Sequence, residues 1–173
     1  MQILTIGHST RPIETFIEML RDAGVELLAD VRTIPRSRHN PQYESATLAA
    51  SLEQAGIVYR HMPALGGLRK PLRDSTINNA WRNASFRGFA DYMQTSDFAA
   101  ALDELIAIAR NQAVAIMCSE GAPFRCHRSL IADALLARGI ATSEIGTHGH
   151  LRAHRPTSFA HLDGASVTYP ASE

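Results

Sequence analysis

The chain has few cysteines, a single lysine and no long apolar run, and these features limit the classes of protein to which it can belong. No segment approaches the roughly 18 consecutive apolar residues that a membrane-spanning helix needs, so we expect no membrane partner. The N-terminus has no secretory-signal pattern, because residues 2–6 already have the composition of a strand. We therefore expect a cytoplasmic protein, in which two cysteines are more commonly free thiols than a structural disulfide.

The formal net charge of zero argues against a uniformly basic nucleic-acid-binding domain, but the charges are unevenly distributed. Residues 31–90 carry nine basic side chains against three acidic ones. Within this basic span, Arg36, Arg38 and His39 lie in a loop flanked by prolines. Such a loop could bind phosphate or a nucleic-acid backbone, or it could simply be a solvated basic loop.

Apolar, strand-like segments alternate along the chain with segments of helical periodicity. The expected strands are residues 3–6, 27–31, 57–61, 113–118 and 140–145, with a further short strand near 167–169. The expected helices begin near Pro12 and then cover residues 45–55, 86–94, 98–110 and 128–138, with Ser96 or Asp97 as a cap. This alternation predicts a single α/β domain with a mostly parallel central sheet of about five strands and helices on both faces.

Two segments interrupt the alternation. Residues 62–85 are long, contain glycine and arginine and have weak periodicity, as is typical of loops that are functional or mobile. From Gly146 onward the chain is polar and contains several histidines, so we expect an irregular extension there. We assign residues 1–154 to the core of the domain and residues 155–173 to a C-terminal extension.

The segment Ala113–Leu130 concentrates reactive side chains at the end of an expected strand. Cys118 ends this strand, and Glu120, Cys126 and His127 follow closely. In an open α/β sheet, ligands bind at the carboxyl ends of the strands. We therefore expect a site here with Cys118 as nucleophile or substrate contact, because the neighbouring basic side chains favour its thiolate.

Simpler interpretations of the cysteines stay open. Cys118 could be a buried residue at a strand end, which is the commoner case for a lone cysteine, or it could form a transient bond with Cys126. The spacing from Cys118 to Arg125 is one residue longer than in the cysteine phosphatase loop, and Glu120 would repel phosphate, so we reject that assignment. Two cysteines eight positions apart and one histidine match no usual zinc spacing, so we expect no metal.

Proton transfer and anion binding have candidates in the same segment. Glu120 is a candidate general base, unless it forms an ion pair with Arg125 or Arg128. His127 is a candidate proton shuttle, unless it is a surface residue at the start of a helix. Arg125 and Arg128, together with Arg32, are candidates for holding an anionic substrate.

The first strand ends in residues that suit a ligand contact. Gly7 allows close approach of the backbone, and His8 and Ser9 supply polar groups. Ser9 or Thr10 could instead cap the helix that follows.

The second and third strands end in further candidates for substrate binding. Asp30 and Arg32 flank Val31 and so project to the same face, either as an ion pair or with Arg32 on the ligand. Gly66 and Gly67 indicate a tight turn at the same edge of the sheet.

Taken in order, these motifs resemble the bacterial family known as domain of unknown function 488. The motifs are Thr5-Ile6-Gly7-His8-Ser9, Asp30-Val31-Arg32 with Pro35 and Ser37, Leu65-Gly66-Gly67, and Met117-Cys118-x-Glu120 with Cys126-His127-Arg128. The resemblance covers residues 1–154 and implies a compact α/β domain with a polar site, but no particular reaction. It also adds His154 to the site as the late histidine of the family pattern, and Glu144 stands where that pattern has another histidine.

Three functions follow, in this order. The first is an enzyme, without a bound cofactor, that acts on a small anionic substrate such as a nucleotide or another phosphorylated metabolite. The second is a nucleic-acid-binding module that uses the basic span of residues 32–87. The third is a thiol redox or metal sensor. A homo-oligomer is compatible with each of them.

Overall fold

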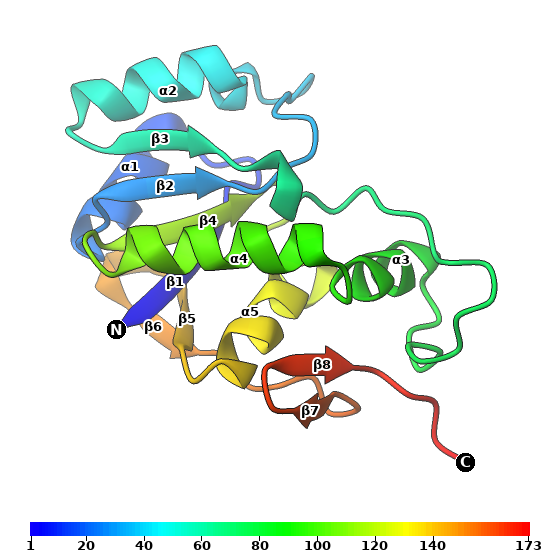
Figure 1. The fold of residues 1–173 in the computed structure, drawn as a ribbon. Coiled ribbons are helices and arrows are strands. Elements are labelled where there is room, and N and C mark those ends of the chain that lie inside the picture. Colours follow the sequence, from blue (N-terminus) through cyan, green and yellow to red (C-terminus); the bar gives the residue numbers. More distant parts are fainter.

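The computed structural model describes the whole chain, from Met1 to Glu173, and consists of a six-stranded sheet with helices around it and a two-stranded hairpin (Figure 1). The strands are β1 (Gln2–Gly7), β2 (Leu27–Asp30), β3 (Val58–His61), β4 (Val114–Cys118), β5 (Ala141–Ile145), β6 (Leu151–Ala153), β7 (His161–Asp163) and β8 (Ser166–Thr168). The helices are α1 (Ile13–Asp22), α2 (Ser45–Gln54), α3 (Ala84–Tyr92), α4 (Ser96–Ala109) and α5 (Arg128–Ala137). None of these helices combines the length and the apolar character needed to cross a membrane.

The large sheet has the order β3-β2-β4-β1-β5-β6, and its first five strands are parallel. Helices α1 and α2 cover one face, and α4 and α5 cover the other with α3 beside them (Figure 1). Strand β4 is buried at every position because both of its faces are covered. Its alternate residues Ile116 and Cys118 pack on the side of α4 and α5. The α/β class and the parallel sheet confirm the prediction from the sequence.

The parallel register brings three strand ends together at one edge of the sheet. Gly7 at the end of β1 pairs with Cys118 at the end of β4. On the other side of β4, Asp30 at the end of β2 pairs with Met117. The segments that follow these strands therefore leave the sheet side by side, and this is where the cleft described below opens.

The C-terminal part of the chain differs from the prediction. The sheet has six strands rather than about five, because β6 adds to β5 as an antiparallel edge strand. The segment after Gly146 is therefore not simply irregular, and it also contains the β7–β8 hairpin, in which β8 confirms the short strand expected near residues 167–169. Strands β6 and β7 are only three residues long and exposed at each position, so they lack the apolar alternation by which strands are recognised. Gly164, at φ +58° in the first position of the two-residue turn between β7 and β8, was a signal for this hairpin.

Two helix starts also differ. The side chain of Thr95, rather than Ser96 or Asp97, accepts the backbone N–H of Phe98 and caps α4. Helix α1 starts after Pro12 with no side-chain cap, so neither residue 9 nor residue 10 has that role. Ser9 therefore has no capping function.

Candidate functional site

A cleft of about 310 Å³ opens at the carboxyl edge of the sheet, between the ends of β2 and β4 and the start of α5. It is lined by Arg32, Thr33, Ile34, Arg36, Gly67, Leu68, Ser85, Phe86, Cys118, Ser119, Glu120, Arg125, Cys126 and His127. Six of these belong to the residues that the sequence assigned to a site, and they come from three separate motifs. The fold thus brings the motif after β2, the glycine turn and the cysteine segment to one place.

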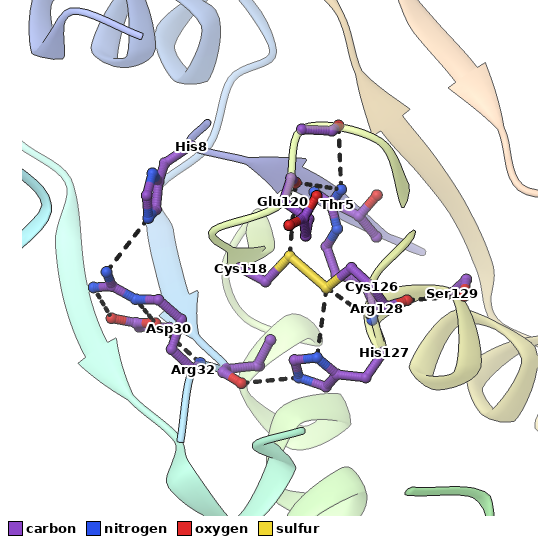
Figure 2. Close-up of a disulfide and its surroundings, with 12 residues drawn as sticks. Thr5, His8, Asp30, Arg32, Cys118, Glu120, Cys126, His127, Arg128 and Ser129 are labelled. Atoms are coloured by element: carbon purple, nitrogen blue, oxygen red, sulfur yellow. Dashed lines mark hydrogen bonds and ion pairs between the residues drawn. A yellow bond between two sulfur atoms is a disulfide. The ribbon is translucent and has the colours of Figure 1, made fainter. Parts of the chain in front are cut away.

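The sulfur atoms of Cys118 and Cys126 form a disulfide in the wall of this cleft (Figure 2). The bond closes the loop of residues 119–125, which we call the cysteine loop, and it leaves the chain without a free cysteine. The sequence favoured free thiols, with a bond between these two residues as the alternative. Neither sulfur can act as a nucleophile in this state, so thiol chemistry requires reduction of the bond by two electrons and two protons.

His127 lies against Cys126 in a defined tautomer. Its Nε2 is 2.9 Å from the carbonyl oxygen of Val31, and its Nδ1 is 3.4 Å from Cys126 Sγ (Figure 2). Since a carbonyl can only accept, Nε2 carries the proton and Nδ1 presents its lone pair to the sulfur. Burial lowers the pKa of His127 to about 4, which leaves the imidazole neutral near pH 7. A neutral base therefore faces Cys126, rather than Cys118 as the sequence suggested.

The two cysteines also differ in their other neighbours. The backbone N–H of Arg128, in the first turn of α5, points at Cys126 Sγ from 3.5 Å. The one hydrogen-bond contact of Cys118 Sγ is with the carbonyl oxygen of Glu120, at 3.7 Å, and a carbonyl cannot stabilise a negative sulfur. In the reduced protein, an N–H donor and the start of a helix would thus support a thiolate at Cys126 alone.

Asp30 and Arg32 form a buried ion pair beside the cleft (Figure 2). Arg32 donates from Nε and Nη2 to the two carboxylate oxygens, at 2.9 and 2.7 Å, and its Nη1 lies 3.5 Å from His8 Nε2. Tyr59 donates its hydroxyl to the same carboxylate at 2.6 Å. Because a guanidinium has five N–H donors and three are used here, Arg32 keeps two for a ligand in the cleft that it lines.

His8 and Ser9 lie outside the cleft and contact residues that line it. The His8 ring is buried and stacks on Tyr43 with the ring centres 4.1 Å apart. Its Nδ1 donates to the carbonyl of Ser9 at 2.7 Å, which leaves the lone pair of Nε2 for Arg32, and burial lowers its pKa to about 4. The backbone N–H of Ser9 donates to the carbonyl of Ser119 at 2.9 Å. Neither residue lines the cleft, so both position the groups that do.

Three glycines of the predicted site motifs are required by close approach. A Cβ at Gly7 would lie 1.7 Å from the carbonyl oxygen of Glu120, so the cysteine loop lies directly on the end of β1. A Cβ at Gly67 would lie 2.7 Å from His127 Nδ1, and the ring therefore occupies the space of a side chain. Gly66 is packed in the same way against Thr33 and does not reach the cleft.

Arg128 and His154 lie away from the cleft. Arg128 is fully buried, donates from Nη2 to the carbonyl of Glu120 at 2.9 Å, and places Nη1 3.4 Å from Glu144 Oε1. It therefore fixes the cysteine loop from beneath and has no contact with the cleft. His154 pairs with Asp133 at 2.7 Å and lines a separate cavity.

The charges that remain free in the cleft are mainly positive. Arg36 and Arg125 are exposed and take part in none of the ion pairs of the molecule. Glu120 is the only acidic residue in the lining, and it is likewise exposed and pairs with neither Arg125 nor Arg128. The sequence assigned Arg36 only to a basic loop, whereas the structure places it in the lining of the cleft. Its position shortly after β2, at the carboxyl edge of the sheet, could have indicated that it belongs to the site. No group of three His, Cys, Asp or Glu side chains is arranged to hold a metal ion.

Two histidines, the buried His8 and the half-buried His127, predict a loss of stability in acid. His8 and His127 have pKa values of about 4 in the folded chain, against about 6.5 when unfolded. Between these pH values the unfolded chain binds more protons, so the free energy of unfolding should fall as the pH decreases from 6.5 to 4. We expect up to about 1.4 kcal/mol per pH unit from each histidine, measured by urea denaturation. His127→Gln should remove one contribution and His39→Gln, in an exposed loop, none; equal slopes in all three proteins would contradict this.

Comparison with known proteins identifies one family. The model of the family described as domain of unknown function DUF488 matches residues 12–135, which include the Asp30–Arg32 motif, the glycine turn and the whole cysteine segment. No curated protein and no solved structure matches the chain. Because the family model covers well over half of the 173 residues, the chain belongs to the DUF488 family.

Proposed function

We propose that this protein is an enzyme that binds a small anionic substrate, a nucleotide or another phosphorylated metabolite, in the cleft beside Cys118 and Cys126. The observation that carries the proposal is the pair of unpaired guanidinium groups, Arg36 and Arg125, at a cleft with a single carboxylate. Guanidinium forks match the oxygen geometry of phosphate, and the free N–H groups of Arg32 add to them. The disulfide in the wall adds a reactive group that a simple anion-binding pocket does not need.

The contacts favour Cys126 as the nucleophile of the reduced protein, with His127 as its base. As Cys126 Sγ attacks an electrophilic atom of the substrate, its proton moves to His127 Nδ1 and the leaving group departs with its bonding electron pair. Water then cleaves the bond between sulfur and substrate, with Glu120 accepting a proton from that water and the thiol recovering the proton held on His127. Cys118 is assigned a substrate contact.

Binding of inorganic pyrophosphate to the reduced protein tests the anion subsite. We expect Arg36→Gln and Arg125→Gln each to weaken binding about tenfold or more, because each removes a charge-assisted hydrogen bond of roughly 1.5–3 kcal/mol. Arg110→Gln, an exposed arginine outside the cleft, should leave the affinity unchanged. Titration calorimetry of the four proteins after reduction measures this. No binding by the wild type, or equal loss in all three variants, would exclude the subsite.

The disulfide supports a second candidate function, a thiol redox sensor. The two functions differ in what reduction changes. For the enzyme, incubation with a set of nucleotides should give turnover only in the reduced state, and Cys126→Ser should keep pyrophosphate binding while losing turnover. For the sensor, the pyrophosphate affinity should change about tenfold between the two states, with no compound consumed.

A further inference from the structure

A second and larger cavity lies on the other side of the cysteine loop. Its volume is about 740 Å³, within the range of small-molecule sites, and it shares no lining residue with the cleft described above. It is bounded by the cysteine loop, by β1 at Thr5, by the first turn of α5 and by the segment that contains β6. Its lining consists of Thr5, Trp81, Pro123, Phe124, Ser129, Glu144, Arg152, Ala153, His154, Arg155 and Thr157.

The free charges of this cavity are two guanidinium groups. Arg152 and Arg155 are exposed and form none of the ion pairs of the molecule. The other two charged or titratable residues of the lining are already engaged. Glu144 contacts Arg128 and accepts a hydrogen bond from the Thr5 hydroxyl, and His154 is paired with Asp133. An anion that entered this cavity would thus meet two guanidinium groups that form no ion pair, one of which, Arg152, lies opposite the Glu144 carboxylate in the β5–β6 pair.

The cavity also has an aromatic wall with an unpaired donor. The indole of Trp81 is held by ring contacts to Phe86, Phe159 and Tyr169, with centroid separations of 5.0, 4.8 and 5.4 Å. Its Nε1–H is buried and has no acceptor. Buried donors are nearly always hydrogen-bonded, so this one calls for an acceptor from outside the chain, either a water molecule or a ligand. Phe124, 66 % exposed, adds a second aromatic surface to the lining.

We propose that this cavity is a second ligand site, for a nucleoside monophosphate. Arg152 and Arg155 would hold the phosphate, whose charge of about −1.5 to −2 at neutral pH matches two guanidinium groups better than a carboxylate does. Trp81 and Phe124 would contact the base, and the Trp81 N–H would donate to an oxygen or nitrogen of the ligand. The site is independent of the cleft at the cysteines, so the test of this proposal does not depend on the function proposed there.

Trp81 is the only tryptophan of the chain, so its fluorescence reports on this cavity directly. We expect adenosine 5′-monophosphate to change the emission in a saturable way, and equilibrium dialysis to give the same affinity. Arg152→Gln and Arg155→Gln should each weaken binding about tenfold, and Arg110→Gln, an exposed arginine outside both cavities, should leave it unchanged. Phe124→Ala should weaken binding of the nucleotide but not of inorganic phosphate, and adenosine alone should bind weakly.

Three results would overturn the proposal. One is an absence of binding in dialysis. Another is equal affinity for inorganic phosphate and the nucleotide, which would leave the aromatic wall without a role. The third is loss of binding in Arg36→Gln but not in the variants of Arg152 and Arg155, which would move the nucleotide to the cysteine cleft. All five side chains to be changed are exposed, so the variants should fold as the wild type does.

Discussion

Replacing Asp30 by alanine should destabilise the fold by about 3–5 kcal/mol, more than any other single change argued for this site. The carboxylate is fully buried and accepts hydrogen bonds from Arg32 Nε, Arg32 Nη2 and the Tyr59 hydroxyl. Its removal leaves the guanidinium of Arg32, only 6 % exposed, without a counter-charge. Breaking a buried pair from one side costs more than the pair contributes, because the remaining charge cannot return to water. Urea denaturation at pH 7 measures the loss.

A double-mutant cycle isolates the interaction between these two residues. Arg32→Met should also destabilise, because it leaves Asp30 charged and buried, but Asp30→Ala combined with Arg32→Met should cost at least about 2 kcal/mol less than the sum of the single changes. Arg138→Met is the matched control, since its partner Asp103 is 73 % exposed and a surface pair contributes at most about 1 kcal/mol. Strictly additive effects at positions 30 and 32 would show that the pair is not coupled.

The fold was predictable where a strand is buried on both faces. Strand β4 reads as an unbroken apolar run, and only a covered parallel sheet accommodates such a run at its centre. Strand β6 was not predictable, because its three residues are exposed and its position follows from hydrogen bonding to β5 alone. The sequence therefore specifies the layers of this domain more strongly than it specifies the edges of the sheet.

The contacts of the site were predictable only where the spacing of residues along the sequence determines them. Asp30 and Arg32 lie two apart and must share a face, so their ion pair was one of two expected arrangements. The place of Arg128 could not be deduced, since it points beneath the loop toward Glu144, sixteen positions away in the sequence. His154 likewise belongs to the second cavity because β6 follows β5 as an edge strand and carries it there. Such assignments depend on tertiary contacts that local spacing does not contain.

In the reduced protein, Cys126 should react with iodoacetamide about ten or more times faster than Cys118 at pH 7. Cys126 faces the neutral Nδ1 of His127 and the N–H of Arg128, whereas Cys118 has only a carbonyl acceptor. Both sulfurs lie in the wall of the same cleft, so access does not explain a difference of this size. Cys118→Ser and Cys126→Ser each leave one thiol, and mass spectrometry of timed samples, after treatment with a dithiol reductant and its removal, gives the two rates.

The effect of substituting His127 shows the cause of this difference in alkylation rate. If His127 accepts the thiol proton, His127→Gln should slow alkylation of Cys126 about tenfold and leave Cys118 unchanged. If the helix start and the Arg128 N–H alone support the thiolate, His127→Gln should have little effect, and the role of His127 as a base would be withdrawn. A faster reaction at Cys118 would return the nucleophile to the residue that the sequence favoured. Since the disulfide removes both thiols at once, whichever sulfur reacts first also sets where an oxidant begins to close the site.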